Sequence, residues 1–109
     1  MVKEAEILKE FLKMIGAAGT REVLEFLDKN KEGQYKDFLH SASCHMLNVR
    51  LRQLLEFDLI EYHVTRLVKK REWYTITKRG KKIVHHLREM EEIMRECLHE
   101  HSIEPVVEK

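Results

Sequence analysis

The sequence predicts a mainly α-helical protein with one small β-hairpin and a long C-terminal helix. Apolar residues recur every three or four positions over most of the chain, as on one face of a helix, whereas alternation is confined to residues 60–77. A length of 109 residues corresponds to one domain. We expect this domain to span residues 1–101, followed by a flexible tail at residues 102–109.

Composition excludes several classes of protein. Apolar residues make up 43% of the chain and charged residues 36%, which is typical of a soluble globular protein. No apolar run approaches the ~20 residues that a membrane span needs. The stretch MVKEAEILKEFLKMIG mixes acidic with apolar residues, unlike a signal peptide. Cys44 and Cys97 are too few for a disulfide scaffold. We therefore expect a cytoplasmic protein without membrane contact.

The net charge of +1 conceals a strong segregation of charge along the chain. Residues 1–33 carry 6 Lys/Arg and 7 Asp/Glu, residues 34–88 carry 12 and 5, and residues 89–109 carry 2 and 7. The local net charges are therefore −1, +7 and −5. A charge run alone more often marks a solvated face, but a basic excess this long favours contact with a polyanion.

The first part of the chain is expected to form three helices. Residues 1–16 form the first, and Thr20 is expected to cap a second that ends in the turn signal at residues 30–33. A short third helix is predicted over residues 34–41. The apolar residues at helical spacing in the first helix are Ile7, Leu8, Phe11, Leu12 and Ile15. Those expected on the buried faces of the second and third helices are Val23, Leu24, Phe26, Leu27, Tyr35, Phe38 and Leu39.

A fourth helix is predicted from the stretch SCHMLNVRLRQLLEFDLI, in which Ser43 can cap the N-terminus. One face carries leucines at i, i+4, i+7 and i+8, namely Leu47, Leu51, Leu54 and Leu55. The opposite face carries His45, Asn48, Val49, Arg52 and Gln53. Two short helices joined by a tight turn, the second with a polar and basic face, are typical of a helix-turn-helix motif.

A hairpin is predicted next, with strands at residues 60–67 and 72–77 and a basic tip at residues 68–71. Ile60, Tyr62 and Val64 share one side of the first strand, and Tyr74 and Ile76 of the second point inward. Thr77 is expected to end the second strand and to cap the helix that follows. Because glycine inside a helix costs ~1 kcal/mol, Gly80 suggests a close approach to the sheet or to a neighbour.

This order of elements resembles a winged helix-turn-helix of the MarR, ArsR and PadR type. The resemblance covers residues 20–88 and rests on MLNVRLRQLLEFDLIEYH and YTITKRGKKI, on either side of the basic hairpin. The matching positions are Leu47, Leu51, Leu54, Leu59, Ile60, Tyr74, Ile76, Thr77 and Gly80. Asp58 stands where the family has glycine, so we expect a turn that persists with some strain. The implied fold has its helix-turn-helix and wing at residues 20–77 and a dimerisation helix at residues 78–101.

The resemblance implies a sequence-specific DNA-binding transcription regulator, with repression as the favoured activity. In such folds the recognition helix enters the major groove of double-stranded DNA, and the wing lies on the backbone or in the minor groove. Asn48 suits adenine, Arg52 suits guanine or phosphate, and Val49 suits a thymine methyl group. The residues expected to contact DNA are Ser43, His45, Asn48, Val49, Arg52, Arg66, Lys69, Lys70 and Arg71.

The long C-terminal helix carries an apolar seam with heptad spacing, formed by Ile83, Leu87, Met90, Met94, Cys97 and His101. A helix of this length cannot bury its far end against a small domain. We therefore expect a homodimer whose interface includes the first five of these residues. The alternative is a helix that folds back on its own domain.

An ArsR-like metal or redox sensor is an alternative function. Cys97 and His101 are spaced i, i+4, which suits zinc. His86, Cys97 and Glu100 also resemble the ligands on the C-terminal helix of ArsR-like sensors, where both subunits contribute. However, Val84 occupies the place of that site's aspartate, and a cysteine on an apolar seam more often simply packs.

Cys44 with His40 and His45 is a second possible metal cluster. A winged-helix protein-interaction module is a further alternative, which the basic recognition face and wing disfavour. An enzyme is not expected, because the sequence holds no Gly-rich phosphate loop, no nucleophile elbow and no paired carboxylates that face a pocket. No cofactor is expected either.

Overall fold

The computed structural model describes residues 3–101 and confirms a mainly helical fold with a small β-hairpin and a long last helix. Its helices are α1 (Glu4–Ile15), α2 (Thr20–Asn30), the short 3-10 helix η1 (Tyr35–Phe38), α3 (Cys44–Glu56) and α4 (Lys78–His101). Its strands are β1 (Glu32–Gly33), β2 (Ile60–Thr65) and β3 (Arg71–Ile76). The tail predicted at residues 102–109 lies outside the described residues.

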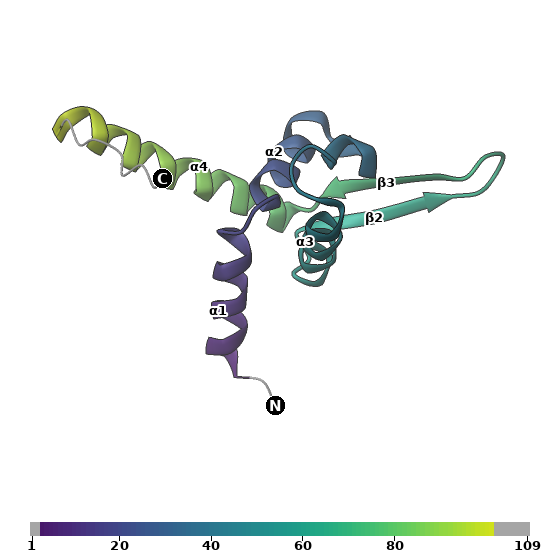
Figure 1. Ribbon diagram of the computed structural model, residues 1–109, viewed down its shortest axis with the longest axis horizontal. Coiled ribbons are helices and arrows are strands. Elements are labelled where there is room, and N and C mark those ends of the chain that lie inside the picture. Colours follow the sequence, from purple (N-terminus) through teal and green to yellow (C-terminus); the bar gives the residue numbers. More distant parts are fainter. Residues whose placement is uncertain (1–2, 102–109) are drawn as a thin grey trace.

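The three strands form one antiparallel sheet in the order β1-β3-β2, and Figure 1 shows β2 and β3 side by side. The β2–β3 hairpin projects from one side of the helical body, α4 projects from the other, and α1 diverges from α4. The radius of gyration is 16.4 Å, compared with about 13 Å for a compact domain of this length. Within residues 3–101, no helix is both long enough and apolar enough to cross a membrane.

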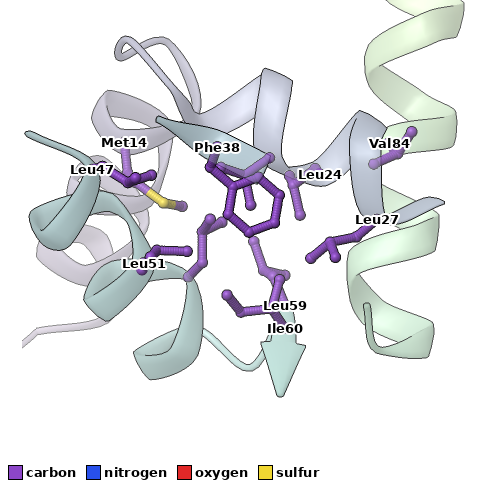
Figure 2. Packing of buried hydrophobic residues seen from close by; sticks show 11 residues of the cluster. Met14, Leu24, Leu27, Phe38, Leu47, Leu51, Leu59, Ile60 and Val84 are labelled. Carbon is purple, nitrogen blue, oxygen red and sulfur yellow. The ribbon is translucent and has the colours of Figure 1, made fainter. Parts of the chain in front are cut away.

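The core is a cluster of buried apolar side chains from five helices, β2 and the turn before β2, gathered around Phe38 (Figure 2). Its members are Met14, Val23, Leu24, Leu27, Phe38, Leu47, Leu51, Leu54, Leu59, Ile60 and Val84. Burial of each large side chain contributes roughly 1.5–3 kcal/mol, so this cluster holds α2, η1 and α3 together. Val84 packs the first turns of α4 against the core. It is adjacent to Ile83, the first residue of the predicted heptad seam, and is not itself part of that seam.

Ion pairs outside the core also attach α4 to α2. Arg88 donates to Glu25 at 2.8 Å and to Asp28 at 2.9 Å, and Arg21 pairs with Glu91. The hydrogen bonds to Glu25 and Asp28 raise the pKa of Arg88 above its ordinary value. The first half of α4 is therefore tied to α2 over about two turns.

Two predictions about the first helices are wrong. Thr20 is the first residue of α2 and not its cap, because Gly19, with φ 89°, occupies the cap position. The Thr20 hydroxyl instead donates to the Met14 carbonyl at 2.6 Å and so closes the turn between α1 and α2. The predicted helix at residues 34–41 is only the short η1, and Leu39 is 43% exposed rather than buried.

The turn signal at residues 30–33 also contains a strand that the sequence did not reveal. Gly33 belongs to β1 and lies opposite Tyr74 of β3. A Cβ atom at Gly33 would lie 2.8 Å from Phe38 and 2.9 Å from Phe26. Glycine is required here because two aromatic rings close over the strand.

The hairpin is shorter than predicted, and its tip is shifted. β2 ends at Thr65, so Leu67 belongs to the loop, and Arg71 is the first residue of β3 rather than part of the tip. Ile60 is buried, but Tyr62 and Val64 on the same side are 43% and 44% exposed. The side chains on this face of β2 therefore point toward the core at the start of the strand and toward solvent further along it.

Two predictions at the end of β3 are confirmed. The Thr77 hydroxyl accepts the Gly80 amide at 3.0 Å, so it caps α4, and it donates to the Asp58 carbonyl at 2.8 Å. A Cβ atom at Gly80 would lie 2.2 Å from the Leu59 carbonyl oxygen. Asp58 adopts the left-handed conformation, with φ 59°, at the turn where some strain was expected.

Replacing Gly80 by alanine should destabilise the fold by about 1–3 kcal/mol, because the new methyl group collides with the Leu59 carbonyl. Gly16→Ala is the matched control. Its Cβ meets nothing closer than 3.8 Å, so it should stabilise the protein by about 0.4–1 kcal/mol. Urea denaturation followed by circular dichroism measures the free energy of unfolding of both variants. Equal changes in the two would contradict the close approach of Gly80 to the Leu59 carbonyl.

Candidate nucleic-acid interface

The recognition helix predicted from the leucine pattern is α3, and its two faces are distinct. The Ser43 hydroxyl accepts the Met46 amide at 3.3 Å, which confirms the predicted cap. Leu47, Leu51 and Leu54 are buried, whereas Leu55 at the end of the ladder is 37% exposed. The side chains predicted to contact DNA from this helix are Ser43, His45, Asn48 and Arg52, which are exposed, and Val49, which is half-buried.

Arg50 is a residue of α3 that the sequence analysis missed. It is 7% exposed, its Nε donates to the Ala18 carbonyl at 2.8 Å, and its Nη1 donates to Gln53 Oε1 at 2.8 Å. Its Cγ lies 3.5 Å from where a Cβ of Gly19 would stand. Arg50 therefore ties α3 to the turn between α1 and α2 and fixes the rotation of the helix about its axis. Gln53, predicted to face outward, is part of this contact.

The basic residues of the hairpin fall into two groups. Lys70 pairs with Glu72 at 3.3 Å, and Arg71 pairs with Glu32 of β1 at 3.0 Å. Lys69 has no ion pair or hydrogen bond among the side chains of residues 3–101. Of these three cations, Lys69 is therefore the one whose charge is not already partly neutralised.

Aromatic side chains stiffen the hairpin on both of its faces. On one face the rings of Tyr62 and Tyr74 lie 5.4 Å apart. On the other, His63 stacks on Trp73 at 5.2 Å, and the Arg71 guanidinium lies 4.5 Å above the Trp73 ring. Cross-strand pairs of this kind hold the two strands in register, so the hairpin projects as a rigid arm.

Glu72 is a negative charge within this basic arm. Tyr62 donates a 2.5 Å hydrogen bond to its carboxylate. This bond and the nearby Lys70 lower the pKa of Glu72, and the same bond raises the pKa of Tyr62. Glu72 therefore remains ionised and holds Lys70 close to the strand.

A hollow of roughly 680 Å³ lies between η1 and the hairpin. Its lining is polar and aromatic and comprises Gln34, Tyr35, Lys36, Tyr62, Glu72 and Tyr74. Burial, and then the neighbouring Cys44 at the start of α3, raise the pKa of Tyr35. The hollow therefore separates η1 from the hairpin, and Tyr35 on its wall is the residue that neighbours the start of α3.

The seam predicted on α4 changes from buried to exposed along the helix. Ile83 and Leu87 are half-buried, Met90 and Met94 are each 56% exposed, and Cys97 is half-buried. Beside the exposed part lies an apolar groove of roughly 550 Å³, lined by Ile15, Gly16, Arg21, Leu87, Met90, Glu91, Met94, Arg95 and Leu98. The outer half of α4 therefore presents an apolar face that the other elements of residues 3–101 leave exposed.

Within residues 3–101, no group of three or more His, Cys, Asp or Glu side chains could hold a metal ion. Cys44 is exposed, and His86 contacts Glu89 at 3.0 Å. His86 and Cys97 stand eleven residues apart on α4, which corresponds to ~16 Å. The two side chains cannot bind one metal ion within a single chain.

Comparison with known proteins agrees with this geometry. A family model described as HxlR-like helix-turn-helix matches residues 21–102. The chain is similar to a MarR-family transcriptional regulator from Enterococcus faecalis V583, with a TM-score of 0.75, 13% identity and 94% of each chain covered. It is also similar to the reduced form of the transcriptional regulator YodB from B. subtilis, with a TM-score of 0.67, 19% identity, and 84% of this chain and 89% of that chain covered. At these identities the structures share the fold. No curated protein sequence matches.

Replacing Arg50 by leucine should lower the free energy of unfolding by about 1–3 kcal/mol, because the Ala18 carbonyl loses its donor. Arg52→Leu is the matched control on the exposed face and should change stability by no more than about 0.5 kcal/mol. Guanidinium denaturation of both variants measures the difference. A similar loss for both would show that Arg50 does not hold α3 in place.

Proposed function

Because the chain belongs to the HxlR-like helix-turn-helix family, a family of winged-helix transcription regulators rather than enzymes, we propose that it binds specific DNA sequences as a homodimer and represses transcription in the cytoplasm. The observation that carries this proposal is the exposed face of α3. Asn48 and Arg52 lie one helical turn apart on that face. Neither side chain has a hydrogen-bond or ion-pair partner within residues 3–101. Both are therefore available to an external partner.

The chemistry of this face suits the edges of base pairs. Asn48 can donate to and accept from adenine, and Arg52 can donate twice to guanine or once to a phosphate. Ser43, His45 and Val49 complete the N-terminal half of the helix, the part that enters the major groove in proteins of this fold. Because Leu47 and Leu51 are buried on the opposite side, α3 can enter the groove without exposing the core.

The hairpin supplies the contact with the DNA backbone in this proposal. It lies beside α3 and carries Arg66, Lys69, Lys70 and Arg71. Cationic side chains that neutralise phosphates release counterions and supply affinity that does not depend on sequence. In this arrangement α3 recognises the base sequence, and the hairpin provides most of the electrostatic attraction to DNA.

The exposed face of α4 supports the homodimer. Met90, Ile93 and Met94 are each more than half exposed, and the adjacent groove is apolar. Exposed apolar patches of this kind in a soluble protein mark interaction sites. A two-fold dimer would place two copies of α3 on neighbouring half-sites, about 34–36 Å apart on B-DNA.

Asn48→Ala and Arg52→Ala should each weaken binding to a duplex selected from a random library by about 1–3 kcal/mol. If Asn48 reads a base, its variant should lose preference at one position per half-site and keep non-specific binding. Fluorescence anisotropy at several salt concentrations separates the two roles. Lys29→Ala, an exposed cation on α2, is the control and should bind like wild type. Unchanged binding by both α3 variants would exclude this helix as the reader.

Lys69→Ala should weaken binding to all sequences alike and flatten the slope of log K against log salt by ~0.9. Lys70→Ala should change the slope less, because Glu72 already partly neutralises this lysine. The same titrations supply the measurement, and Trp73, the single tryptophan of the chain, reports on contact with the hairpin through its fluorescence. Equal slopes for wild type and Lys69→Ala would mean that the hairpin does not contact phosphates.

Replacing Met90 and Met94 together by aspartate should convert the dimer to a folded monomer, because two charges enter an apolar interface while neither side chain supports the core. Glu96→Lys, on the other side of α4, is the control for an equally drastic change of charge. Sedimentation equilibrium at tens of micromolar measures both. A wild-type protein that is monomeric at this concentration would refute the homodimer.

A further inference from the structure

We propose that Leu67 and Val68, the apolar tip of the hairpin, insert between base pairs from the minor groove and kink the DNA. This inference rests on the proposed DNA-binding function and adds the mode of contact at the wing. It starts from two adjacent aliphatic side chains that are 94% and 100% exposed. Among residues 3–101 the next most exposed large apolar side chain is Leu12, at 66%.

The apolar tip differs from the other exposed apolar residues in its position. Those on α1 and α4 lie on helix faces that can pack against another helix. Leu67 and Val68 lie in the loop between β2 and β3, at the end of the arm that projects away from the helical body (Figure 1). A dimer formed through α4 on the opposite side of the body would leave them uncovered.

Charge around the apolar tip identifies the partner. Arg66 precedes it and Lys69 follows it, with Lys70 and Arg71 next along the chain. The partner must therefore be a polyanion that also offers an apolar slot. The minor groove meets both needs, because two phosphate strands flank the stacked bases, and a side chain that enters there can separate two base pairs.

The arm is long and stiff enough for this contact. Leu67 lies seven residues beyond Ile60, where β2 leaves the core, which at ~3.3 Å per residue gives a reach of roughly 23 Å. Adjacent major and minor grooves lie about half a helical turn apart, roughly 17 Å. The aromatic pairs on both faces of the hairpin hold it straight, so force on the tip is transmitted to the body.

The test compares two double variants of the full-length protein on a duplex selected by wild type. In the first, Leu67→Ser and Val68→Ser remove the apolar tip. In the second, Leu67→Met and Val68→Ile preserve it. Because both residues are almost wholly exposed, all proteins should unfold at the same temperature. Affinity, energy transfer between dyes at the duplex ends and the fluorescence of 2-aminopurine at successive steps are measured.

We expect the serine variant to bind about tenfold more weakly, to leave the duplex straight and to give no rise in 2-aminopurine fluorescence. The Met/Ile variant should bind and kink the duplex like wild type. Lys69→Ala should weaken binding but keep the kink, which separates insertion from electrostatic attraction.

Several outcomes would overturn the inference. If the serine variant binds and kinks the duplex like wild type, insertion does not occur, although the proposed function stands. If the serine variant becomes monomeric, or loses binding to phosphatidylglycerol vesicles while it keeps binding to DNA, the tip contacts protein or lipid instead. If wild type selects no duplex from the library, the proposed function fails, and the insertion fails with it.

Discussion

The architecture depends on one junction, where the end of α3, the start of β2, the end of β3 and the start of α4 meet. Asp58 turns the chain in the left-handed conformation, and its carbonyl accepts the Thr77 hydroxyl. The Leu59 carbonyl accepts the Thr77 amide and lies against Gly80, and Arg79 pairs with the Asp58 carboxylate at 3.1 Å. These contacts hold α3, the hairpin and α4 at fixed angles. A displacement of one therefore moves all three.

The parts of the fold that follow from local chemistry could be predicted from sequence. A ladder of leucines at helical intervals and a threonine that caps a helix depend on neighbours within a few residues, and both were found. β1 was missed because its two residues carry no pattern and pair with a strand some forty residues later. Arg50 was missed because its acceptor, the Ala18 carbonyl, lies in a distant turn. One signal did exist, since position 50 falls on the apolar face, between Leu47 and Leu51.

The candidate site was predictable in outline for the same reason. The exposed positions of α3 can be inferred from its buried ones, because residues on the side of a helix opposite its apolar face point to solvent. The charges of the hairpin were harder to judge, since whether Arg71 is available depends on Glu32, nearly forty residues away in sequence. The apolar seam of α4 was expected to be covered by a second copy or by the chain itself. Over residues 3–101, Leu12 of α1 and Met90, Ile93 and Met94 of α4 are more than half exposed. A partner that covers these side chains only in the folded protein would also stabilise the fold.

The separation of the two faces of α3 has a consequence for how such a protein can evolve. Its folding information lies in the leucine ladder and in Arg50, whereas Asn48 and Arg52 contribute nothing to the core. If α3 reads DNA as proposed, one copy can accumulate substitutions on the outer face after gene duplication and acquire a new target sequence. Every intermediate on that path stays folded, because the inner face is unchanged. Divergence of specificity is therefore limited by selection on binding and not by stability.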